Sequence, residues 1–171
     1  IYGVPPLTFA AEDGYAAIVR LLIGRPGVEI DPTDEYGRTP LLFAARGRPS
    51  RCNPVADFEA VMALLLSTNE INVNARERNG RTALSWAAGN GYLARVKALL
   101  AIPGIDPNLK DNKGRTPLDW AKRNGHIKVI DFLRMKPIPS DDEDELGVIH
   151  IEEIFPDGDS TEERVFINSR N

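Results

Sequence analysis

The sequence predicts an all-α solenoid built from repeated pairs of short helices. Four segments of the chain resemble one another, and their leading glycines lie 34, 43 and 34 residues apart, at Gly3, Gly37, Gly80 and Gly114. Each segment contains two helical patterns with apolar residues on one face, followed by a stretch rich in Pro, Gly, Asn and Asp. The longest wholly apolar run, 60–66, is seven residues long and too short to cross a membrane. One such unit cannot bury its own apolar face, so neighbouring units are expected to stack.

The first helix of each unit is expected to begin after a threonine and to end at a glycine. A threonine hydroxyl accepts a hydrogen bond from a free amide of the first turn, and proline at the next position loses no helical hydrogen bond. The first unit departs from this pattern, because Pro5 stands where the threonine belongs. The expected caps are Thr39, Thr82 and Thr116, with Pro40 and Pro117 after the first and last of them. The expected stops, in the left-handed conformation, are Gly14, Gly91 and Gly125.

The second helix of each unit is expected to carry one apolar face. The spacing is clearest in the second unit, where apolar residues recur at i, i+3, i+4, i+7 and i+8. These residues are Phe58, Val61, Met62, Leu65 and Leu66. In the other units the same face is predicted to contain Ile18 and Leu22, Val96 and Leu100, and Val129 and Leu133.

The chain divides into a repeat array, 1–136, and an acidic tail, 137–171. The expected repeats are 1–33, 34–76, 77–110 and 111–136, and the second has an inserted loop at 46–56 because the middle interval is nine residues too long. Residues 1–139 hold 14 acidic and 19 basic residues, a net charge of +5, whereas residues 140–171 hold 11 and 2, a net charge of −9. A mildly basic body therefore carries a strongly acidic tail.

The repeated sequence pattern resembles that of a known family. Gly-Arg-Thr-Pro-Leu at 37–41 and 114–118, then paired alanines, a glycine, a Leu-Leu pair and an Asp-Pro-Asn or Asn-Val-Asn turn, resemble the ankyrin repeat. Tetratricopeptide repeats share the period but lack the Thr-Pro-Leu start and the turn rich in Pro and Gly. The resemblance covers 2–136, about four-fifths of the chain. Trp86, Trp120 and an extra residue in each turn also resemble ankyrin arrays of large fungal multidomain proteins.

Two features of the family pattern are missing. The histidine common near the start of the first helix is replaced in all four units, by Thr8, Leu42, Ser85 and Asp119. The chain also opens on Ile-Tyr-Gly, without an initiator methionine, and the first unit lacks its cap, which is consistent with a cut inside a longer array.

The resemblance implies a non-catalytic module that binds a protein through a concave face, the tips of the turns and the inserted loop. Most side chains expected there are basic or polar, so we expect an acidic partner surface or another domain of the same chain. The expected partner-binding residues are Tyr36, Arg38, Arg46, Arg78, Asn79, Arg81, Asn90, Asn112, Lys113, Arg115 and Arg123.

Two sets of these residues have a structural interpretation as well. Arg38, Arg81 and Arg115 occupy equivalent places, so they either bind the partner or stack along the scaffold. Trp86 and Trp120 also occupy equivalent places, and a repeated aromatic favours packing between repeats over a binding platform.

No pattern for catalysis, cofactors or metals is found. The chain has no glycine-rich phosphate loop, and its only histidines, His126 and His150, lack metal-ligand spacing. Cys52 lies near Arg48 and Arg51 in the inserted loop, but no base or oxyanion hole is near in sequence, and we interpret it as an ordinary thiol. A charge of +5 without exposed aromatics does not favour nucleic acid. We expect a monomer in the cytoplasm or nucleus, with no membrane contact.

The tail has three competing interpretations. Val148, Ile149 and Ile151 between acidic flanks resemble a SUMO-interaction motif, which adds a strand to a partner's sheet. The tail could instead fold back on the basic face of the array and regulate it, with Ser140 and Ser160 resembling sites of acid-directed kinases. It could also cap the last repeat or begin another domain, and 148–155 with 164–167 could form a short β-hairpin.

The sequence thus favours a protein-binding module. The alternatives are an autoregulatory array whose acidic tail covers its own basic face, and the repeat portion of a larger enzyme or receptor. The ankyrin scaffold serves unrelated functions, so the fold alone does not choose among them.

Overall fold

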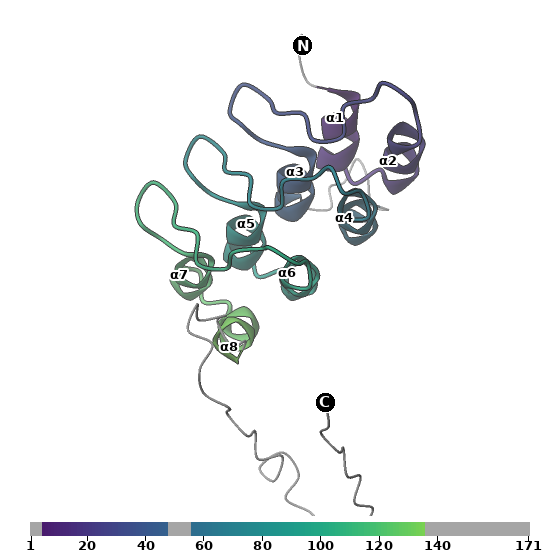
Figure 1. Ribbon diagram of the computed structural model, residues 1–171. Coiled ribbons are helices and arrows are strands. Elements are labelled where there is room, and N and C mark those ends of the chain that lie inside the picture. Colours follow the sequence, from purple (N-terminus) through teal and green to yellow (C-terminus); the bar gives the residue numbers. More distant parts are fainter. Residues whose placement is uncertain (1–4, 48–55, 136–171) are drawn as a thin grey trace, which may run out of the picture. The chain divides into compact units, whose positions relative to one another are not determined.

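The computed structural model describes residues 5–47 and 56–135, and these residues form eight helices in four pairs (Figure 1). The first helices of the pairs are α1 (Pro6–Glu12), α3 (Pro40–Arg46), α5 (Ala83–Gly89) and α7 (Pro117–Arg123). The second helices are α2 (Ala16–Ile23), α4 (Phe58–Leu66), α6 (Leu93–Leu100) and α8 (Ile127–Met135). None of the helices in these two described ranges is both long and apolar enough to span a membrane.

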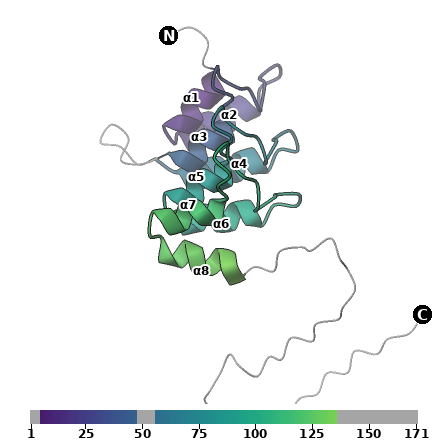
Figure 2. The same ribbon diagram turned by 90° about the vertical axis from the view of Figure 1, so that its left-hand side faces the viewer.

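The helices form two layers that run along the array. In Figure 1 the first helices make one column and the second helices make another, and three long turns project from the side of the first column. Figure 2 shows the pairs lying one above another in chain order. Each first helix packs against the first helix of the next pair and against its own second helix. The predicted all-α solenoid is confirmed for the described residues, which contain no strand, and the expected hairpin of the tail lies outside them.

The helix ends follow from the residues that the sequence places there. Thr39 accepts a hydrogen bond from the amide of Leu42 (3.3 Å), and Thr82 and Thr116 do the same three residues downstream (3.2 Å each). Asp119 completes a capping box by accepting from the amide of Thr116 at 3.0 Å. The predicted glycine stops also have positive φ, 73° at Gly14, 76° at Gly91 and 71° at Gly125. Pro5 caps α1 without any side-chain hydrogen bond.

The core lies between the two layers and is continuous along the array. It combines leucines of the first helices with branched residues of the second, among them Leu41, Leu84, Val61 and Val96, all at most 1% exposed. Burial of such side chains stabilises an array by roughly 1.5–3 kcal/mol each. No single pair could achieve this burial alone, because helices of the neighbouring pair pack against both layers.

One predicted core residue is wrong. Ile18 is 45% exposed, and its neighbour Val19 is the buried residue of α2. Ile18 is equivalent to Arg95 and Val129, a position that faces the preceding repeat. No repeat among the described residues precedes α2, so nothing covers Ile18 there.

Neighbouring turns are joined by backbone hydrogen bonds near their tips. The amide of Arg78 donates to the carbonyl of Tyr36 (2.8 Å), and the amide of Asn112 donates to the carbonyl of Asn79 (3.0 Å). The side chain of Asn112 donates to the carbonyl of Arg78 at 2.8 Å. The tips are therefore held in register, which fixes the spacing of the side chains that they present. We call the surface formed by α3, α5, α7 and the tips 35–38, 78–81 and 112–115 the inner face.

A buried arginine fastens the two ends of the insertion to the array. Arg95 of α6 is 3% exposed, and its Nη1 donates to the carbonyls of Ala44 (3.1 Å) and Gly47 (2.6 Å) at the end of α3. Its Nε donates to Glu59 Oε1 at 2.9 Å, and its guanidinium lies 4.7 Å from the centre of the Phe58 ring. Arg95 thus holds together the residues that flank 48–55, which lie outside the described part.

Candidate functional site: the inner face

An acid, an arginine and an aromatic residue recur at each turn of the inner face. In repeat 4, Asp111 accepts hydrogen bonds from Arg115 Nε (2.9 Å) and from Trp120 Nε1 (3.1 Å). Asp111 also accepts from the backbone amides of Lys113 and Arg115 at 2.8 and 2.9 Å. Burial would raise the pKa of Asp111, but these hydrogen bonds outweigh burial and lower the pKa to about 2. The carboxylate therefore stays charged and fixes the turn.

Repeat 2 has the same arrangement with a phenylalanine as its aromatic member. Asp34 accepts from Arg38 Nε at 2.7 Å and from the backbone amides of Tyr36 and Arg38 at 2.9 and 2.8 Å. The guanidinium of Arg38 lies 4.6 Å from the centre of the Phe43 ring. The charge of Arg38 is thus already compensated within its own turn.

Repeat 3 departs from this arrangement because Glu77 replaces the aspartate. Glu77 is 8% exposed, and its Oε1 has no hydrogen-bond partner in the described part of the chain. The same holds for Arg81 Nε and Trp86 Nε1, the groups whose equivalents in repeat 4 bond to Asp111. The side chain of glutamate is one methylene longer than that of aspartate, so the compact set of hydrogen bonds does not form. Repeat 3 therefore keeps two donors and one acceptor unfilled.

Arginines and tryptophans alternate along the inner face. Arg81 lies between the rings of Trp86 (3.6 Å) and Trp120 (3.9 Å), and Arg115 lies on Trp120 at 4.0 Å. Arg46 lies on Trp86 at 4.9 Å. Trp86 and Trp120 thus pack against arginines of the preceding repeat, which confirms the interpretation of the repeated aromatic as packing between repeats.

The central arginine of this row has a lowered pKa, and burial is the main cause. The pKa of Arg81 falls to about 10, although the charges of Glu77 and Asp111 oppose the shift, and those of Arg115 and Arg46 contribute less to it. Arg81 remains charged at neutral pH.

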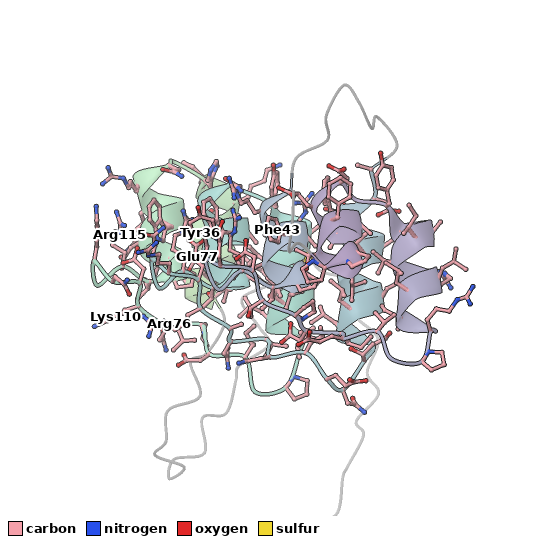
Figure 3. The ribbon with its side chains drawn as sticks, turned by 90° about the horizontal axis from the view of Figure 1, so that it is seen from above. Tyr36, Phe43, Arg76, Glu77, Lys110 and Arg115 are labelled. Atoms are coloured by element: carbon pink, nitrogen blue, oxygen red, sulfur yellow. The ribbon has the colours of Figure 1, made fainter. Side chains whose placement is uncertain are left out.

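Two pockets adjoin each other on the inner face and share Arg46 and Trp86. One, of about 430 Å³, is lined by Arg46, Trp86, Glu12, Phe43, Gly47 and Asn90, and we call it the helix pocket. The other, of about 420 Å³, is lined by Arg46, Trp86, Tyr36, Arg38, Glu77, Arg78 and Asn79, and we call it the turn pocket. Figure 3, seen from above, places Tyr36 and Glu77 side by side and Phe43 further along the array. Both pockets are large enough for one amino-acid side chain.

The structure places the predicted partner-binding residues on one surface but not with equal access. Arg81 is buried, with 8% exposure, and Arg38 and Arg115 are half-buried and paired with turn acids, so these three belong largely to the scaffold. Asn90 is also half-buried, and its amide donates to the carbonyl of Arg46 at 3.4 Å. The exposed members are Tyr36, Arg46, Arg78, Asn79, Asn112, Lys113 and Arg123.

Sequence reasoning missed Glu77 and Arg95. The other two turns have an aspartate, Asp34 or Asp111, at the position of Glu77, so the glutamate indicated that the turn of repeat 3 has different hydrogen bonds. An arginine at 95, in an otherwise apolar position, signalled a buried polar contact. Phe43 could also have been found, because it is the third member of the series with Trp86 and Trp120.

The remaining candidates lie away from the inner face or outside the described residues. His126 is structural, since its Nε2 donates to the carbonyl of Gly89 at 3.0 Å. Across residues 5–47 and 56–135, no group of three or more His, Cys, Asp or Glu side chains is placed to hold a metal ion. Cys52, His150 and the tail motif Val148, Ile149 and Ile151 fall outside those ranges.

Comparison with known proteins identifies the repeat. Family models described as ankyrin repeats match residues 52–144 and 7–52. Alpha-latrotoxin-Lg1a of Latrodectus geometricus is 36% identical over 90 residues, 52% of this chain and 6% of the toxin. Ankyrin repeat-containing protein C6C3.08 of Schizosaccharomyces pombe is 29% identical over 94 residues, 55% of this chain and 37% of that protein. Ankyrin repeat and KH domain-containing protein mask-1 of Caenorhabditis elegans is 35% identical over 96 residues, 56% of this chain and 3% of that protein. The match thus spans only a minor part of each relative.

Proposed function

The chain belongs to the ankyrin repeat family, and on this premise we propose that its array is a non-catalytic module that takes up a partner protein on the inner face. Ankyrin repeats are generally protein-interaction modules, and the family is typically non-catalytic. The observation that supports the inner face is the pair of open pockets there, since the exposed Arg46 lines both pockets and the exposed Arg78 lines the turn pocket. Neither arginine makes an ion pair with any residue of the described ranges. Exposed cations beside aromatic walls are typical of binding surfaces that recognise acidic proteins.

The proposed contact surface contains the exposed residues of the turn tips and of the ends of the first helices. Arg46 and Arg78 lie at its centre, and Lys113 and Arg123 extend it over repeat 4. Arg38, Arg81 and Arg115 contribute mainly by holding the aromatic rings and the turn acids in place. The partner is another protein or another domain of the same chain. The intracellular site, the monomeric state and the lack of nucleic-acid binding remain predictions from the sequence.

Site-specific photocrosslinking tests this proposal. A benzoylphenylalanine at Tyr36, which is 42% exposed, replaces one aromatic side chain by another on the inner face. The matched control carries the same group at Ala98, an exposed residue of α6 in the other helix layer. We expect position 36 to capture, in cells that express the chain, a protein that position 98 does not capture. The purified partner should then bind the full chain, and Arg46→Gln with Arg78→Gln should weaken that binding at least tenfold. Equal capture at both positions, or no effect of the two substitutions, would refute the proposal.

Autoregulation by the acidic tail is the second candidate, because residues 140–171 carry a charge of −9. In this alternative the tail competes with the partner for the same arginines. Replacement of the acids in 141–145 by their amides, within the full chain, should then raise the affinity for the partner. An unchanged affinity would exclude competition by the tail. A third candidate, an array that serves a larger enzyme or receptor, is compatible with the same surface.

A further inference from the structure

We propose that the helix pocket and the turn pocket together bind one extended peptide of the partner protein, with a carboxylate in the turn pocket and an apolar side chain in the helix pocket. This inference rests on the proposed function and specifies the chemistry of the ligand. Arg46 and Trp86 form the ridge between the two pockets, so neighbouring side chains of one peptide can enter one on each side.

The charges place the carboxylate in the turn pocket. Arg46 and Arg78 line that pocket and make no ion pair within the described residues, whereas Arg38 is already bound to Asp34. Glu77 also lines it, but its charge faces that of Arg81. The exposed acid Glu12 lines the helix pocket and would repel a second carboxylate there. The two pockets therefore differ in the charge that they accept.

The aromatic walls place the apolar side chain in the helix pocket. Phe43 and Trp86 both line it, and Gly47 closes it without a side chain of its own. An apolar side chain against these rings would lose its contact with water, which stabilises binding by about 25 cal/mol for each Å² buried. Phe43 is 4% exposed, so the half-buried ring of Trp86 offers most of this apolar contact.

The unfilled hydrogen-bonding groups favour a peptide over a simple anion. Trp86 Nε1 needs an acceptor and Glu77 Oε1 needs a donor, and both residues line the turn pocket. A peptide backbone offers both a carbonyl and an N–H, whereas a phosphomonoester dianion offers acceptors alone. Both atoms are buried, so neighbouring side chains must move before a peptide reaches them. In repeat 4 the same groups are filled by Asp111, which explains why we place the site at repeats 2 and 3.

The two tryptophans allow a direct test on the full chain. Only Trp86 and Trp120 give indole N–H signals in an ¹⁵N spectrum, and Trp86→Phe assigns them. The probe is a synthetic peptide, capped at both ends, with two Asp-Leu pairs separated by serine. We expect it to shift the Trp86 signal with saturation, while the Trp120 signal, whose N–H donates to Asp111, stays in place. A shift of both signals together, or of neither, would overturn the proposal.

Three substitutions and one control define the site. Arg46→Gln and Arg78→Gln should each weaken the peptide at least fivefold, and the matched change Arg20→Gln, at an exposed arginine of α2, should leave the affinity within twofold. If the three arginine substitutions weakened the peptide equally, net charge alone would account for the attraction, and the proposed site would be wrong. Glu77→Asp should let residue 77 accept from the Trp86 indole as Asp111 does from Trp120, and should weaken the peptide at least threefold. Unchanged binding by that variant would remove the role of the unfilled groups.

Three further probes separate the ligand classes. A peptide with serine in place of leucine should bind at least fivefold more weakly, and equal binding would remove the helix pocket from the proposal. Polyphosphate or a single-stranded oligonucleotide that shifts the Trp86 signal at lower concentration than the peptide would assign the site to another anion. A tenfold gain in affinity on amidation of 141–145 would make the tail of this chain the occupant instead of a partner. Failure of these peptides together with specific capture at Tyr36 would leave the proposed function intact, whereas failure of both experiments would reject it.

Discussion

Replacement of Arg95 should destabilise the array far more than replacement of any exposed arginine. Its guanidinium is buried and donates to three carbonyls near the end of α3 and to Glu59. Glu59 is 56% exposed, so the ion pair itself contributes less than about 1 kcal/mol. Ala44 is 0% exposed, so its carbonyl would lose its donor in a buried place, and an unfilled buried acceptor costs about 1–3 kcal/mol. The contact with the Phe58 ring adds roughly 0.5–2 kcal/mol.

These contributions together give a loss of about 1.5–6 kcal/mol for Arg95→Ala, most of it from the unfilled carbonyls. Arg95→Lys keeps the charge but fewer hydrogen bonds and should lose about 1–2 kcal/mol. Urea unfolding, followed by circular dichroism and by the fluorescence of the two tryptophans, measures both values. Amide exchange at Gly47 and Asp57 should also become faster, because both residues flank the insertion that Arg95 fastens.

The control is Arg20→Ala, at an exposed arginine of α2. It should cost less than about 0.5 kcal/mol. Arg95→Ala within 1 kcal/mol of this control would refute the view that Arg95 fastens the insertion, and Arg95→Lys gives a second measurement if the alanine variant does not fold.

Three other predictions concern stability. Asp111→Asn should remove a contribution to the free energy of unfolding on the order of 1 kcal/mol, because the pKa of the carboxyl is about 2 in the folded chain and usually 3.8. This contribution is full above about pH 4 and is lost as the pH falls toward 2. Urea unfolding at several pH values checks it, and the same loss of stability with falling pH in the variant and the parent chain would contradict it. Gly47→Ala should cost about 1–3 kcal/mol, since a methyl group there would overlap the ring of Phe58, whereas Gly24→Ala has room and should be neutral within about 0.5 kcal/mol. Thr82→Ala should lower the free energy of unfolding by about 1 kcal/mol through loss of the helix cap, and the serine variant should retain most of it.

The fold was predictable from the sequence because its determinants are local and repeated. A threonine caps the start of α3, α5 and α7, a proline follows it in α3 and α7, and each of these residues acts within a few positions of itself. The second helices were predicted from apolar spacing, which also worked, except at the first repeat. Ile18 failed because its burial depends on a neighbouring repeat, and apolar spacing within one helix carries no information on what lies beside it.

The inner face was predictable only in outline. The repeat pattern gave the positions that share a surface, but the exposure of each arginine depends on its acid and its aromatic neighbour. Arg38 and Arg115 are paired and Arg81 is stacked, whereas Arg46 at the end of α3 makes no ion pair within the described residues. These differences come from contacts between repeats, which no single repeat's sequence contains.

The departure at Glu77 connects stability and function in this chain. The aspartates at the equivalent positions accept hydrogen bonds from the arginine of their own turn, and in repeat 4 also from the tryptophan. An aspartate at 77 would accept in the same way from Arg81 and Trp86. The chain instead leaves three buried polar groups unfilled, at a cost of about 1–3 kcal/mol for each group. The stacking of Arg81 between two indole rings offsets only part of that cost, since such a contact contributes about 2 kcal/mol or less. Departures from a local sequence pattern are most frequent at sites that serve function and not stability. The departure at Glu77 lies beside the two pockets that share Arg46 and Trp86. The same residue that weakens repeat 3 therefore supplies the unfilled groups with which a peptide could bond.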